Sequence, residues 1–108
     1  MKTIREQVYK VIDGERDYQD SKTLRNPNEN QSEPPFSTGD YITMLLYYAN
    51  QLPEAWATNP GEAPPEVLMN MRKVAAIAVQ CQEWWGTVSR EEEGSGVWGQ
   101  RSDQERNN

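Results

Sequence analysis

The stretch that most constrains the fold runs from Val67 to Trp85 and is followed by Gly86. At about 100° per residue its apolar side chains cover an arc far wider than the stripe of a helix that packs on one neighbour. The arc contains Val67, Leu68, Met71, Val74, Ala75, Ile77, Ala78, Val79, Cys81, Trp84 and Trp85. Its alanines favour a helix and let neighbouring helices come close. We therefore expect a central helix that is contacted from more than one side.

The remaining face of this central helix is the more polar one. It contains Met69, Arg72, Lys73, Ala76, Gln80 and Glu83. The amide side chain of Asn70 falls inside the apolar arc instead. A buried amide needs a hydrogen-bond partner or a ligand, so Asn70 is a candidate ligand-binding residue. The alternative is an amide in the first turn of the helix that reaches water.

A first helix is predicted over residues 3–20, where apolar side chains recur at helical spacing. On its helical wheel Glu15 and Gln19 fall inside the apolar stripe, between Val8 and Val11. A carboxylate in this place must meet a partner or have its pKa raised. The alternative is that the helix bends at Gly14 and that Glu15 reaches water. Glu15 and Gln19 are therefore candidate site residues.

A second helix is predicted to begin after Ser37. Ser37 is a good N-cap and Asp40 can complete a capping box, while Phe36 and Tyr41 have the spacing of a hydrophobic staple. Its apolar stripe continues to Trp56 and includes Pro53. Either the helix kinks at Pro53, or a new short helix begins with this proline in its first turn.

These segments predict an all-α fold, a three-helix antiparallel bundle over residues 1–86 with a polar tail over residues 87–108. Only 35% of the chain is hydrophobic, yet it carries four tryptophans and five tyrosines, more than one small core can hold. A surplus of exposed aromatic side chains often marks an interface. We therefore expect a homo-oligomer, with Trp84, Trp85 and Trp98 as the candidate interface residues.

Composition excludes several kinds of site. The chain has no histidine and one cysteine, Cys81, which removes the usual triads, imidazole metal ligands and any internal disulfide. Asp13, Asp17 and Asp20 form one outward stripe, which is more typical of a solvated face than of a metal site. The net charge of −6 argues against binding to a DNA or RNA backbone. No apolar signal region or membrane span is visible, so we expect a cytoplasmic protein.

An anion site is also predicted. If the helices pack with their stripes inward, Glu15, Gln19 and Asn70 could line a shared pocket. Arg16 and Lys73, placed at the polar margins of their helices, could then reach an anion there. Together with Arg5 and Arg72 they make four cations that could form a small anion site. Four cations over two helices are, however, more commonly a solvated surface.

Three segments, VYKVIDGERDYQD, STGDYITMLLYYANQLPEAW and MRKVAAIAVQCQEWWG, resemble small phage-encoded helical proteins that are described as MazG-like. The resemblance spans roughly residues 4–86. It implies an all-α nucleoside triphosphate hydrolase with magnesium held by an ExxE and an ExxD pattern. Neither pattern is present, and only Glu15 and Asp20 could be carried over. In class and size the chain also resembles phage sponges, non-enzymatic oligomers that sequester the signalling nucleotides of bacterial immunity.

The function predicted from the sequence is therefore non-enzymatic binding of a nucleotide-like ligand in the host cytoplasm, without a cofactor or metal. The candidate ligand-binding residues are Glu15, Arg16, Gln19, Asn70 and Lys73. One alternative is an acidic inhibitor that binds a host protein, in part through the segment around Trp98. Another is a MazG-like pyrophosphohydrolase.

Overall fold

The computed structural model describes residues 3–23, residue 27 and residues 33–93, and their regular secondary structure is entirely helical. The helices are α1 (Arg5–Thr23), α2 (Thr38–Ala49), α3 (Gln51–Thr58), α4 (Pro65–Trp85) and α5 (Arg90–Glu93). The predicted all-α class is thus confirmed for this part of the chain. None of the helices described is long and apolar enough to cross a membrane.

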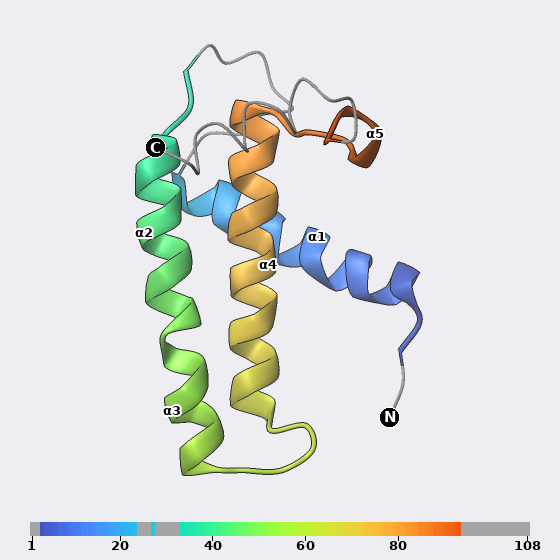
Figure 1. Cartoon of the computed structure of the whole chain (residues 1–108), viewed down its shortest axis with the longest axis vertical. Coiled ribbons are helices and arrows are strands. Elements are labelled where there is room, and N and C mark those ends of the chain that lie inside the picture. Colours follow the sequence, from blue (N-terminus) through green and yellow to red (C-terminus); the bar gives the residue numbers. More distant parts are fainter. Residues whose placement is uncertain (1–2, 24–26, 28–32, 94–108) are drawn as a thin grey trace.

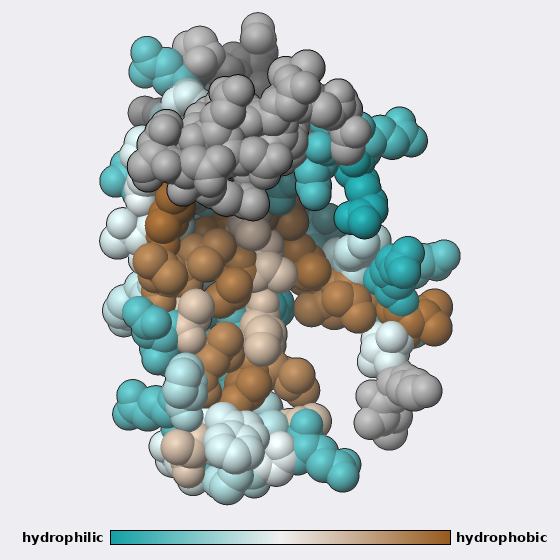
Figure 2. Space-filling view, in the orientation of Figure 1, coloured by the Kyte–Doolittle hydropathy of each residue, from teal (hydrophilic) through white to brown (hydrophobic). Residues whose placement is uncertain are grey.

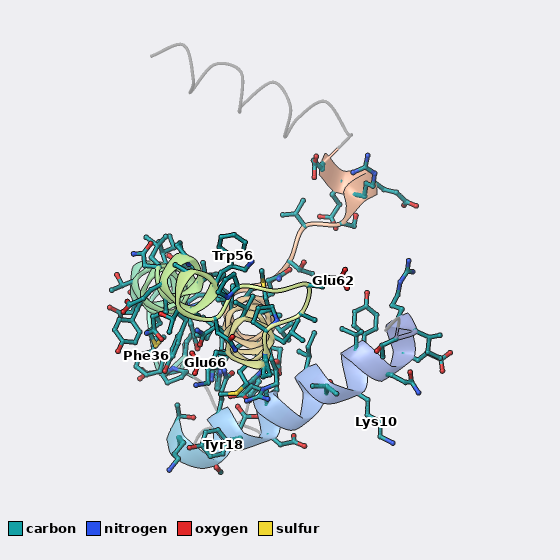
Figure 3. The ribbon with its side chains drawn as sticks, turned by 90° about the horizontal axis from the view of Figure 1, so that it is seen from below. Lys10, Tyr18, Phe36, Trp56, Glu62 and Glu66 are labelled. Carbon is teal, nitrogen blue, oxygen red and sulfur yellow. The ribbon has the colours of Figure 1, made fainter. Side chains whose placement is uncertain are left out.

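The helices are arranged as an antiparallel pair with a third helix laid across it (Figure 1). α2 and α3 follow each other almost in line and run beside α4 in the opposite direction. α1 crosses α4 at a steep angle, and its N-terminal half stands away from the pair (Figure 3). The predicted three-helix antiparallel bundle is therefore not confirmed, because α1 does not run alongside the other two segments.

The start of α2 follows its local sequence signals. The Ser37 hydroxyl accepts a hydrogen bond from the Asp40 backbone N–H at 3.1 Å, and the Asp40 carboxylate accepts one from the Ser37 N–H at 3.1 Å. The rings of Phe36 and Tyr41 pack edge to face with centroids 5.6 Å apart. The predicted capping box and staple are confirmed. α2 ends at Ala49 and α3 begins at Gln51, so Pro53 lies in the first turn of a new helix.

The central helix, α4, begins at Pro65 and ends before Gly86. Proline suits the first turn because its missing N–H would have no partner there. Gly86 stops the helix with φ +103° and ψ 167°, a conformation that essentially only glycine adopts. Its N–H still donates to the Gln82 carbonyl at 2.8 Å, which closes the last turn.

The buried core is small and lies on an unexpected side of α4. The buried residues are Arg16, Tyr41, Ala55, Pro64, Ala76, Ile77 and Gln80. Ala76 and Gln80 belong to the remaining face of α4, outside the apolar arc, and are buried because α1 covers this face. Leu68 and Met71, predicted to be inside, are about half exposed. Apolar surface is accordingly visible over the helices in Figure 2.

The segment predicted to be a polar tail begins with a short helix. Ser89 caps α5, since its hydroxyl accepts a hydrogen bond from the Glu92 backbone N–H at 3.0 Å. Residues 94–108, with the predicted interface residue Trp98, lie outside the described residues.

Candidate functional site

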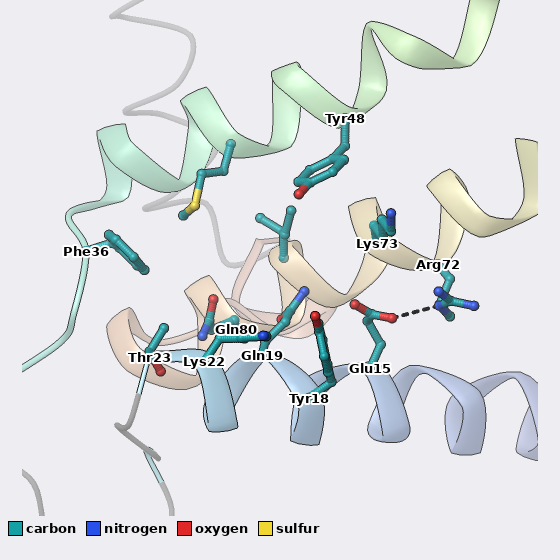
Figure 4. A pocket seen from close by; sticks show the side chains of 12 residues that line it. Glu15, Tyr18, Gln19, Lys22, Thr23, Phe36, Tyr48, Arg72, Lys73 and Gln80 are labelled. Carbon is teal, nitrogen blue, oxygen red and sulfur yellow. Dashed lines mark hydrogen bonds and ion pairs between the residues drawn. The ribbon is translucent and has the colours of Figure 1, made fainter. Parts of the chain in front are cut away.

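A pocket of about 630 Å³ lies where the C-terminal half of α1 meets α2 and α4 (Figure 4). The residues that line it are Glu15, Tyr18, Gln19, Lys22, Thr23, Phe36, Met44, Tyr48, Arg72, Lys73, Ile77 and Gln80. Its volume falls in the range of small-molecule sites, about 300–1,000 Å³. The pocket brings together three of the five predicted ligand-binding residues, Glu15, Gln19 and Lys73.

Glu15 meets a charged partner inside this pocket. The Arg72 Nε–H donates to its Oε1 at 2.8 Å, and the Glu15 side chain is only 11% exposed. α1 continues through Gly14 without interruption, so the alternative of a bend that exposes Glu15 does not occur. The expectation that a carboxylate within the stripe needs a partner is thus confirmed. The sequence indicated Arg72 only as one of four cations of a possible anion site, and it did not indicate the ion pair with Glu15.

Arg16 has a structural position that the sequence did not indicate. It is 4% exposed and donates hydrogen bonds to Glu83, to Gln19 at 3.2 Å and to Asp20 at 2.9 Å. Burial lowers the pKa of the guanidinium, but its bonds to Glu83 and Asp20 outweigh this and the pKa is raised. The prediction that Arg16 lies at a polar margin, free to bind an anion, is wrong. It instead ties α1 to α4 and holds Gln19 at the edge of the pocket.

Two lysines of the pocket lie over aromatic rings. The Lys73 ammonium is 5.5 Å from the centre of the Tyr48 ring, and the Lys22 ammonium is 5.2 Å from that of Tyr18. Neither lysine forms an ion pair with a carboxylate among the described residues. Cation–π contacts hold a charge in place without neutralising it, so both ammonium groups keep their attraction for an anion.

Asn70 does not line the pocket, and the prediction that it does is wrong. Asn70 and Ile77 lie on the same face of α4, since seven residues make almost two full turns. The pocket, however, starts at Arg72 along this helix and extends toward Gln80. Asn70 therefore lies two residues, about half a turn, before the first pocket residue of α4.

The structure adds several pocket residues that the sequence did not single out. Tyr18 and Lys22 follow Glu15 on the same face of α1, at intervals of three and four residues, and this spacing was the available signal. Gln80 comes from α4, is 3% exposed and has an amide nitrogen without a hydrogen-bond partner among the described residues. No local pattern distinguishes Gln80 from a surface glutamine, because its burial depends on where α1 crosses.

A buried tyrosine, Tyr41, lies close to the charged side chains of Arg16, Asp20 and Glu83. Tyr41 is 1% exposed, and its hydroxyl has no hydrogen-bond partner in the described part of the chain. Burial raises the pKa of Tyr41 to about 12, with a further contribution from Cys81, so the hydroxyl stays neutral at physiological pH. This tyrosine is a packing residue rather than a general base.

The predicted interface residues have different environments. Trp85 is 51% exposed and its indole N–H donates to the Phe36 carbonyl at 2.9 Å, which fixes the end of α4 beside the start of α2. Trp84 is half-buried, and its indole nitrogen has no partner among the described residues. Their role in an interface stays a prediction.

Metal ligands do not converge in the residues described. No three His, Cys, Asp or Glu side chains of residues 3–23, 27 and 33–93 form a group that could hold an ion. Glu15 and Asp20, the two carboxylates that the MazG-like resemblance would assign, are bound to Arg72 and Arg16 respectively. Asp13 and Asp17 are exposed.

Comparison of the chain with protein families, with curated proteins and with solved structures finds no match.

Proposed function

We propose that the protein binds a nucleotide-like small molecule in the pocket between α1, α2 and α4 and does not convert it chemically. The observation that carries this proposal is the concentration of positive charge in an acidic protein. Lys22, Arg72 and Lys73 line the pocket with Glu15 as the single carboxylate, whereas the chain as a whole has a net charge of −6. A cationic pocket in an acidic surface favours a small anion over a nucleic acid, because the long backbone of the latter would meet the surrounding negative charge.

The remaining pocket residues favour an anion that carries a planar ring. Tyr18, Phe36 and Tyr48 supply aromatic faces, and Ile77 and Met44 supply apolar contacts. Stacking of a base on an aromatic side chain contributes about 1–3 kcal/mol and is available to any nucleobase. Cationic and aromatic groups in one pocket are thus suited to both parts of a nucleotide.

Binding without turnover is supported by the way in which the carboxylates are used. A two-metal hydrolase needs carboxylates that converge on the ions. Here Glu15 is held by Arg72, and Asp20 is held by Arg16 on α1 itself. The MazG-like alternative is therefore less well supported than a ligand-binding protein. We further propose that the protein acts as a homo-oligomer, because many of its large apolar side chains are exposed.

The proposal is tested by measuring nucleotide binding to the native chain and to Lys73→Ala. We expect a nucleoside monophosphate to bind the native protein, as measured by calorimetric titration, and to bind Lys73→Ala about tenfold more weakly. The loss corresponds to one charge-assisted contact, about 1.5 kcal/mol.

The matched control is Lys10→Ala, which removes the same charge from the exposed half of α1 (Figure 3). It should bind like the native protein. Equal weakening by both substitutions would show that net charge, and not the pocket, governs binding. Absence of any nucleotide binding to the native chain would refute the proposal.

A further inference from the structure

Gln80 is a buried polar side chain of the pocket with an unused hydrogen-bond donor. The residue is 3% exposed, and its amide nitrogen lacks a partner among the residues that the structure describes. A buried amide that is left unpaired is destabilising, and such a group in a native structure calls for an explanation. Because Gln80 also lines the pocket, a ligand that fills the pocket could provide the missing partner.

The pocket has two chemically different ends (Figure 4). Arg72 and Lys73 lie at one end, beside Glu15 and Tyr48. Toward the other end lie Gln80, Phe36, Thr23 and Lys22, and Tyr18 and Gln19 lie between the two ends. Arg72 and Gln80 are separated by about 12 Å along the axis of α4. A single phosphate ion cannot contact both ends, whereas a molecule with a ring and an anionic group can.

A glutamine side chain presents one donor and one acceptor next to each other. This pair matches the adenine edge, where N7 accepts a hydrogen bond and the 6-amino group donates one. The corresponding edge of guanine or hypoxanthine carries two acceptors, N7 and O6, and would place O6 against the glutamine oxygen. The carboxamide of Gln80 therefore distinguishes a 6-amino purine from a 6-oxo purine.

We infer that the pocket selects an adenine nucleotide, with Gln80 bound to the N7 and 6-amino edge and the phosphate held at the Arg72–Lys73 end. The inference rests on the proposed function, because it names the ligand class of the same pocket. Phe36 lies beside Gln80 and supplies an aromatic contact for the base.

The test compares AMP with IMP in titrations of the full native chain. The two nucleotides differ at position 6 on this edge and also at N1, which lies on the Watson–Crick edge. AMP should bind at least tenfold more tightly than IMP, the discrimination of one good bidentate contact. Gln80→Leu should weaken AMP binding about tenfold, leave IMP binding nearly unchanged and so remove the preference. Gln82→Leu is the matched control, since Gln82 is exposed on the same helix and does not line the pocket.

The possible results separate this inference from the proposed function. Equal binding of AMP and IMP by the native protein would overturn the recognition of adenine by Gln80. The pocket proposal would survive that result if Lys73→Ala still weakened both nucleotides. If neither nucleotide bound, both proposals would fail together. Equal affinities for AMP and IMP would refute the inference without any substituted protein, so the inference can be overturned even if circular dichroism shows that Gln80→Leu does not fold.

Discussion

At the scale of single residues, Arg16 joins α1 to α4 through buried ion pairs. Its guanidinium is buried and bonds to Glu83 on α4 as well as to Gln19 and Asp20 on α1. Arg16→Ala removes these bonds and leaves two partly buried carboxylates without their cation. We expect the free energy of unfolding to fall by about 3 kcal/mol, as measured by urea denaturation.

Arg16→Lys should show an intermediate loss, because a lysine keeps the charge but not the planar fork that reaches several acceptors at once. Lys10→Ala, on the exposed half of α1, should leave the unfolding midpoint within experimental error. A midpoint for Arg16→Ala that equals that of Lys10→Ala would mean that the buried ion pairs do not stabilise the fold.

At the scale of the helical elements, two glycines should respond to alanine in opposite directions. Gly86 ends α4 with φ +103°, where an alanine side chain is strained, so Gly86→Ala should destabilise the protein by about 1–3 kcal/mol. Gly14 lies within α1 with no atom near the place of an added Cβ, so Gly14→Ala should stabilise the helix by about 1 kcal/mol. Thermal unfolding followed by circular dichroism measures both. A stabilising Gly86→Ala would contradict the assigned helix end.

The same elements show how far the sequence allows prediction. Helix ends were predictable because their signals are local: Ser37 and Asp40 cap each other, and Gly86 follows the last apolar residue of α4. The buried side of α4 was not predictable, because its apolar arc is wider than any one neighbour covers. The position at which α1 crosses α4 determines that Gln80 is buried and that Met71 is exposed. The pocket lies where α1 crosses α4, so its α4 residues were only partly predictable: Lys73 was identified and Gln80 was missed.

At the scale of the whole molecule, one face of α1 has two different environments. Its C-terminal part, with Glu15, Tyr18 and Lys22, lines the pocket. The same face continues toward the N-terminus through Val11 and through Ile4, which directly precedes the helix. These side chains are 55% and 63% exposed because this part of the chain extends beyond α4. Several large apolar side chains of α2, α3 and α4 are exposed as well, and such surface on a small chain is typical of an interface.

We therefore expect the protein to self-associate through this apolar surface, with the N-terminal half of α1 as part of the contact. Sedimentation velocity at micromolar concentration should show a species heavier than the 12.4 kDa chain. Val11→Glu places a charge in the exposed row and should shift the protein toward the monomer, since burying an unpaired carboxylate is costly. Lys10→Glu adds a carboxylate to the neighbouring exposed position and should have a much smaller effect. A native protein that sediments only at 12.4 kDa would contradict the expected assembly, and the exposed face of α1 would then be available to a different protein.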